Sequence, residues 1–115
     1  MKVNVKELVK ELNGEPFLEK IVKAVDDKGN ATEVVEKPVI VGKLMINALM
    51  ANYRDDDKCS GEDKIKRYKL SEKIQESTDS IEISVDDISF IKKYVNKAGF
   101  SPLLYTRVHQ VLEGE

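Results

Sequence analysis

The sequence predicts a mainly helical domain of the α+β class, in which about five short helices surround a central apolar helix and a small β-hairpin lies in the first half. Residues 38–53 are apolar on nearly every side of a helix, so they need neighbours on more than one face. Three serine-led patterns, at Ser60, Ser84 and Ser101, mark helix starts in the second half. A length of 115 residues suits one hydrophobic core, so we expect a single domain over 1–115.

The first forty residues predict one helix and one hairpin. Asn4 suits a helix N-cap, and the helix should end at the turn formed by residues 13–16. Its inner side would hold Val5, Leu8, Val9 and Leu12. Residues 17–25 fit two structures, a strand or a helix that ends at Gly29. We favour the strand, because the turn-rich segment that follows leads into the β-favouring run 31–35, which needs an antiparallel neighbour.

The apolar segment is expected to form the central helix, over residues 39–53. Its apolar side chains make two stripes on largely opposite faces, one of them Leu44, Met45, Ala48 and Leu49, and the other Ile46, Met50 and Tyr53. A helix that is apolar on both faces must be enclosed. We expect the rest of the chain to cover most of it, and a partner protein to bind any face left exposed through Ile46, Met50 and Tyr53.

The second half predicts three more helices and a short strand. A charged loop at residues 54–59 leads to a helix over 61–77, and a strand at 81–83 precedes a helix that ends at Gly99. The last helix begins at Pro102. The apolar residues expected to face the core from these helices are Ile65, Tyr68, Leu70, Ile74, Ile88, Ile91, Tyr94, Val95, Ala98, Leu104, Tyr105, Val108, Val111 and Leu112.

Composition restricts the classes of partner and of compartment. The chain has 19 basic and 21 acidic residues and a net charge of −2, so no overall field attracts nucleic acid or an anionic membrane. The single cysteine, Cys59, forms no intramolecular disulfide and no zinc site by itself, which favours a reducing compartment. The longest apolar run, 39–51, is interrupted by polar residues and glycine. We therefore expect no signal peptide, no membrane span and a cytoplasmic location.

No arrangement of residues predicts catalysis. The acids at 55–57 resemble part of a calcium loop, but neither register puts a glycine and a bidentate glutamate where an EF-hand needs them, so a solvated loop is expected. His109 stands apart from any serine or cysteine motif, and Cys59 lies among acids that would disfavour a thiolate. The six glycines are scattered and form no phosphate-binding loop. We expect no enzyme activity, no cofactor and no metal.

One basic row supports an alternative. Lys66, Arg67, Lys69 and Lys73 lie on the predicted helix 61–77 and could contact a phosphate backbone. Acidic residues three or four positions away can pair with most of these basic residues, a pattern that is typical of a solvated helix face. Nucleic-acid binding is therefore the less favoured reading.

The succession of short motifs along the chain resembles small uncharacterised proteins of tailed bacteriophages and prophages. The residues that carry this resemblance are Asn13-Gly14-Glu15-Pro16, Val41-Gly42-Lys43-Leu44 with Asn47-Ala48-Leu49, Ser60-Gly61-Glu62-Asp63-Lys64 with Arg67-Tyr68, Ile83-Ser84-Val85-Asp86-Asp87-Ile88, and Ser101-Pro102-Leu103 with Val111-Leu112-Glu113. The resemblance implies a helical domain and a phage context, in the bacterial host cytoplasm or associated with the virion. It implies no activity and no catalytic residues.

Together these observations predict a non-enzymatic protein-interaction domain. It would act in virion or tail assembly or on a host factor, and its partners would include a second copy of the same chain. The alternative is a small regulatory nucleic-acid-binding protein that uses the basic helix 61–77.

Overall fold

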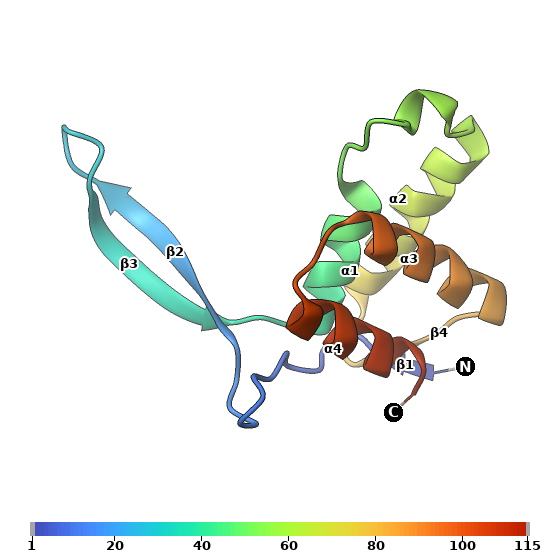
Figure 1. Ribbon diagram of the computed structural model, residues 1–115, viewed down its shortest axis with the longest axis horizontal. Coiled ribbons are helices and arrows are strands. Elements are labelled where there is room, and N and C mark those ends of the chain that lie inside the picture. Colours follow the sequence, from blue (N-terminus) through green and yellow to red (C-terminus); the bar gives the residue numbers. More distant parts are fainter. Residues whose placement is uncertain (1, 115) are drawn as a thin grey trace.

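The computed structural model describes residues 2–114 and shows an α+β fold with two small antiparallel sheets (Figure 1). Strand β1 pairs with β4, and β2 pairs with β3. A short 3₁₀ turn, Asp56–Lys58, follows the first helix. The elements in chain order are β1 (Lys2–Asn4), β2 (Leu18–Val25), β3 (Ala31–Pro38), α1 (Val41–Met50), α2 (Gly61–Glu76), β4 (Ser80–Glu82), α3 (Val85–Lys97) and α4 (Pro102–Leu112).

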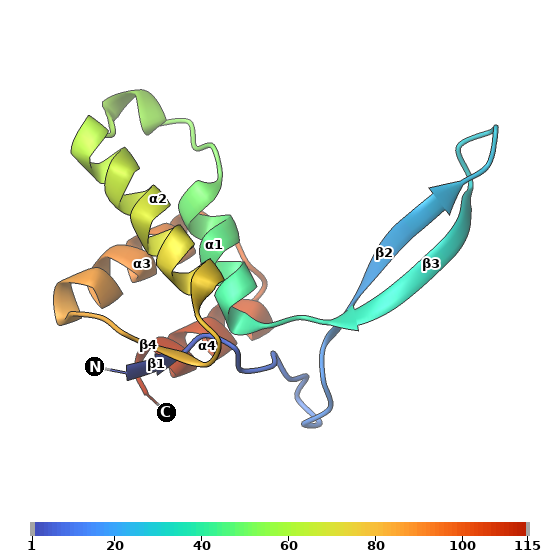
Figure 2. The ribbon, with the colours of Figure 1, turned by 180° about the vertical axis from the view of Figure 1, so that it is seen from behind.

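Helix α1 is the central element of the core, as the sequence predicts. It packs against α2, α3 and α4, while the β1–β4 pair lies beside α4 (Figure 2). The buried residues of α1 lie on one broad face and are Val41, Gly42, Leu44, Met45, Ala48 and Leu49. The helix ends at Met50, three residues earlier than expected.

Serine caps start the three later helices where the sequence places them. The hydroxyl oxygens of Ser60, Ser84 and Ser101 accept hydrogen bonds from backbone N–H groups three residues further on. The β-hairpin is also confirmed, since residues 18–25 pair with 31–38 as antiparallel strands. The open choice for residues 17–25 is thus resolved in favour of the strand.

The expected first helix, over residues 5–12, does not form. Its segment is extended and irregular instead, with Val5 and Val9 buried and Leu12 92% exposed. The physical reason lies in α1, whose N-cap residue makes no side-chain hydrogen bond. The N–H groups of Val41 and Gly42 donate to the carbonyls of residues 7 and 5, at 2.9 and 2.8 Å. The segment thus supplies the acceptors that the N-terminus of α1 needs, and this outweighs its local helix preference.

The hairpin β2–β3 extends away from the helices as an arm (Figures 1 and 2). The radius of gyration is 15.7 Å, whereas a compact chain of this length would have about 13 Å. Apolar side chains on the arm remain in contact with solvent, since Leu18, Val22, Val25 and Val34 are about half exposed. No third strand joins the arm within the described residues.

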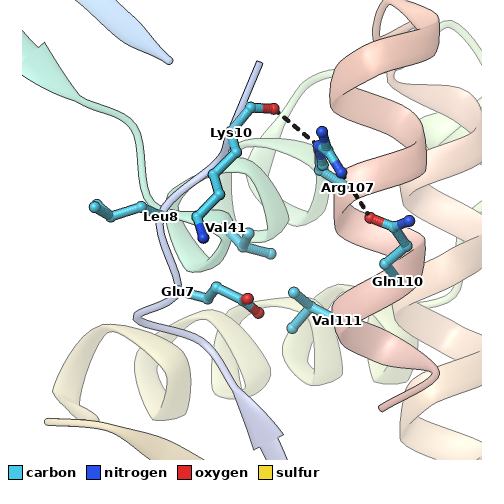
Figure 3. Close-up of a pocket in the computed structure, with 7 residues that line it drawn as sticks. All are labelled: Glu7, Leu8, Lys10, Val41, Arg107, Gln110 and Val111. Carbon is cyan, nitrogen blue, oxygen red and sulfur yellow. Dashed lines mark hydrogen bonds between the residues drawn. The ribbon is translucent and has the colours of Figure 1, made fainter. Parts of the chain in front are cut away.

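The base of the arm is fixed to the helices by backbone and side-chain contacts. Val9 bridges both strands, because its N–H donates to Val39 O and its carbonyl accepts from Phe17 N–H, each at 2.8 Å. Arg107 of α4 donates to the carbonyl of Lys10 at 2.8 Å (Figure 3) and to that of Glu11 at 3.0 Å. The arm therefore extends from a base that is fixed to α4. Arg107, which makes this link, has no signal in the sequence that predicts its role.

Candidate protein-interaction surfaces

The C-terminus of α1 is held by side chains from outside the helix. Arg67 of α2 donates from Nε to Leu49 O at 2.6 Å and from Nη2 to Ala51 O at 2.7 Å. The hydroxyl of Tyr53 donates to Ala48 O at 2.6 Å. These carbonyls are among those that a helix leaves without an intrahelical partner, and a cation is favoured there by the helix dipole. The last turn of α1 is therefore fixed relative to α2.

Arg67 also organises a small cluster between α2 and α3. Its Nη1 forms an ion pair with Asp56 at 3.0 Å, and its guanidinium lies 4.5 Å from the ring centre of Tyr94. Burial raises the pKa of Tyr94 to about 12, so its hydroxyl stays protonated. The Sγ atom of Cys59 lies 3.7 Å from that hydroxyl. These contacts pack α2 against α3, and Arg67 and Asp56 also line an open hollow of about 310 Å³ beside the end of α1.

An apolar groove lies between α1 and α2. Ile46 and Met50, one helical turn apart on α1, face Tyr68 of α2 across a hollow of about 300 Å³. Met50 is 50% exposed and Tyr68 is 55% exposed. Glu72 and Glu76 also line the groove, so its rim on the α2 side is acidic. The groove suits an apolar side chain flanked by basic groups.

The structure separates the three residues predicted to bind a partner. Ile46 and Met50 lie together in the groove, as expected. Tyr53 does not, because its ring packs 6.0 Å from that of Tyr94 and its hydroxyl bonds back to α1. Tyr68 takes its place. The apolar pattern of the sequence predicts Tyr68 on the core face of α2, but Arg67 and Ser71 are buried there and Tyr68 is exposed.

The structure also divides the predicted basic row. Arg67 is 5% exposed and binds α1, so it is not available to a phosphate backbone. Lys66 forms an ion pair with Asp87 at 3.4 Å, and Lys73 donates to Glu82 O at 2.6 Å. Lys69 is exposed. The observed partners of these groups lie on other elements, whereas the spacing predicted pairing within the helix.

The acidic loop contributes to the fold rather than standing free in solvent. Asp55 forms an ion pair with Lys97 at 2.8 Å. Asp56 accepts from the backbone N–H of Tyr53 and from Arg67, and the first of these contacts lowers its pKa most. Within residues 2–114, no group of three His, Cys, Asp or Glu side chains is placed to hold a metal ion.

His109 is a partly buried residue of α4. Its ring stacks 4.3 Å from that of Tyr105, and its buried Nε2 atom has no hydrogen-bond partner. Burial, and then the charge of Lys92, lower its pKa below the ordinary value of 6.5. No nucleophile shares this position in the described part of the chain, so we assign the ring a packing role.

Comparison with known proteins identifies no family for this chain. No family model matches the chain, and no curated protein or solved structure matches it significantly. No helix among residues 2–114 is both long and apolar enough to cross a membrane.

Proposed function

We propose that the chain is a non-enzymatic protein-interaction domain of phage origin that acts in virion or tail assembly or on a host factor. The observation that carries this proposal is the apolar groove of Ile46, Met50 and Tyr68. Exposed apolar surface that is gathered in one hollow is typical of a binding site for another protein.

The neighbours of the groove make it a preformed surface. Residues on the other sides of α1 are buried in the core, and Arg67 ties the end of α1 to α2. Both walls of the groove are therefore held by contacts that do not depend on a partner. A preformed site loses less conformational freedom on binding than a mobile one. The acidic rim at Glu72 and Glu76 selects a partner segment with basic residues beside its apolar anchor.

The resemblance to small proteins of tailed phages and prophages supports the phage context. Assembly factors and inhibitors of host proteins both act by presenting a surface to a partner, and neither needs a catalytic centre. The groove is consistent with both roles.

The proposal is tested by two matched substitutions in a tagged chain expressed in bacteria that carry the phage. Met50→Glu puts a charge into the groove, whereas Ile65→Glu makes the same change at a comparably exposed position of α2 outside it, since Met50 is 50% and Ile65 56% exposed. A phage or host protein should co-purify with the wild-type chain and with Ile65→Glu, but not with Met50→Glu. The proposal is wrong if every co-purifying protein is retained by Met50→Glu or lost equally with Ile65→Glu.

A further inference from the structure

The arm β2–β3 is an incomplete sheet. Its two strands pair only with each other among the described residues, and both faces remain open to solvent. A two-stranded hairpin is marginally stable in water by itself, and an additional strand or a packed face is normally needed. An unpaired edge also offers a row of N–H and C=O groups to any strand that can match it.

Hydrogen bonding at the base of the arm determines which backbone groups face outward. The N–H of Val39 donates to Phe17 O at 3.0 Å, in the same register that pairs Leu18 with Pro38. Antiparallel pairs alternate between hydrogen-bonded and non-hydrogen-bonded types. Val34 and Glu36 therefore belong to non-hydrogen-bonded pairs, and their N–H and C=O groups point away from β2. Pro38, which has no N–H, also belongs to a non-hydrogen-bonded pair. Its missing N–H therefore removes no hydrogen bond between β2 and β3.

The two outer edges of the arm are not equivalent. The pairing is regular from Leu18–Pro38 to Val22–Val34. Beyond this stretch β2 carries an extra residue, Lys23, before Ala24 pairs with Glu33, and β3 carries an extra residue at position 32 before Val25 pairs with Ala31. A bulge of this kind bends the strand and interrupts its edge. The uninterrupted stretch of β3 runs from Glu33 to Pro38, whereas that of β2 ends at Val22, so β3 offers the longer regular edge to another strand.

We propose that the outer edge of β3 pairs antiparallel with the same edge of a second copy, about a two-fold axis that passes beside Val35. The result would be one four-stranded sheet built from two arms. This inference goes beyond the proposed groove function, because it concerns a different surface and would hold if the groove bound nothing.

The charge pattern of β3 is complementary to itself in this register. Val35 meets Val35 of the second copy, and on the same face Glu33 meets Lys37 twice. The neighbouring strand extends these rows, since Ile21 pairs with Val35 and Glu19 pairs with Lys37. Ile21 and Val35 of each copy thus form an apolar row of four side chains across the centre of the sheet. On either side of it, Glu19 and Lys37 of one copy and Glu33 of the other form a row in which acid and base alternate.

Other registers lose this match. The smallest shift that keeps the outward backbone groups facing each other is two residues. One such shift sets Glu36 against Glu36 of the second copy. The opposite shift sets Glu33 against Val35 and Lys37 against Ala31, so both charge pairs are lost. Because complementarity with the same sequence selects one register, a second copy is the occupant that this edge fits.

Light scattering and sedimentation of the full chain, over a wide range of concentration, test the proposal by measuring its mass. The wild type should pass from 13.0 kDa to twice that mass as concentration rises. Glu36→Pro removes one outward N–H from the edge of β3, and Lys20→Pro removes the equivalent N–H from the edge of β2 at the directly opposite residue. Both variants lose the same Lys20–Glu36 cross-strand pair, so they differ only in the edge that is blocked. Glu36→Pro should remain monomeric, and Lys20→Pro should dimerise.

A second pair of variants tests the proposal if the proline variants fold poorly. Glu33→Lys alone and Lys37→Glu alone should each raise the dissociation constant by about tenfold or more, and mixing the two should restore dimers. Asp27→Lys, at the tip of the arm, makes the same charge change as Glu33→Lys and should have no effect. A wild type that is monomeric throughout, a dimer that survives Glu36→Pro, or mixed variants that do not associate would each overturn the proposal, while the Met50→Glu result would be unaffected.

Discussion

Replacing Arg67 with Met should destabilise the fold much more than replacing an exposed basic residue of the same helix. The guanidinium is 5% exposed and donates to Leu49 O, Ala51 O and Asp56. Methionine has an unbranched stem that can pack against Tyr94, but it donates no hydrogen bond. Two carbonyls at the end of α1 and one carboxylate would therefore lose their donor together.

The expected loss follows from the number and the exposure of these contacts. A hydrogen bond to a charged group contributes about 1.5–3 kcal/mol, and removal of one partner from a buried ion pair costs about 3–5 kcal/mol. Asp56 and Ala51 are only partly buried, so water can replace part of what is lost. We therefore expect about 3 kcal/mol, at the lower end of these ranges. This is a large fraction of the roughly 5–15 kcal/mol by which a domain is stable.

Urea unfolding followed by circular dichroism measures this loss. With a slope near 1.5 kcal/mol per molar urea, the midpoint of Arg67→Met should fall by about 2 M. Lys69→Met is the matched control, since Lys69 is exposed on the same helix, and its effect should stay within about 0.5 kcal/mol. The reasoning would be refuted if Arg67→Met and Lys69→Met differed by less than about 1 kcal/mol.

Three further substitutions test other parts of the structure by the same unfolding assay. In Gly42→Ala the added Cβ would lie 2.5 Å from Val5 O, so a loss of about 1–3 kcal/mol is expected, whereas Gly61→Ala meets no atom within 4 Å and should cost nothing; equal effects would contradict the close approach. Tyr53→Phe removes the donor to Ala48 O and should cost about 1 kcal/mol; an unchanged midpoint would show that this bond contributes nothing. Because the pKa of His109 is lowered, its contribution to stability is present above pH 6.5 and is lost as the pH falls through its folded-state value. His109→Leu should therefore lose less stability on acidification, and parallel pH profiles for the two proteins would exclude this explanation.

The features that the sequence predicted well depend on local chemistry. Serine capping needs only the residue and the N–H three positions later, and the bonds at Ser60, Ser84 and Ser101 form as expected. The hairpin follows from a turn that contains Gly29, whose φ of +82° is accessible to glycine at low cost. The central helix follows from the stripe Leu44, Met45, Ala48 and Leu49, which is buried as expected, whereas Ile46 and Met50 of the second stripe are not fully enclosed.

The features that the sequence did not predict depend on contacts between distant segments. Residues 5–9 have a helical pattern, but the carbonyls of residues 5 and 7 accept hydrogen bonds from the first turn of α1, which lies more than thirty positions later. The buried face of α2 includes Arg67 and Ser71, while the apolar Ile65 and Tyr68 face solvent. The prediction is right for Leu70 and Ile74, which are buried, and wrong for Ile65 and Tyr68. Arg67 is buried in their place because its acceptors belong to α1 and to the loop that follows it. One signal was available, since a helix C-terminus such as that of α1 attracts a cation.

Disulfide trapping at Val35 tests the pairing of two arms most directly. In a Cys59→Ser background, Val35→Cys would put two thiols opposite each other at a non-hydrogen-bonded pair, where Cα atoms lie about 4.5 Å apart, within the range of a disulfide. Val34→Cys is the control, because position 34 would face Glu36 of the second copy. We expect rapid oxidation of Val35→Cys to a covalent dimer and little dimer from Val34→Cys. Equal oxidation at both positions, or none at position 35, would contradict it.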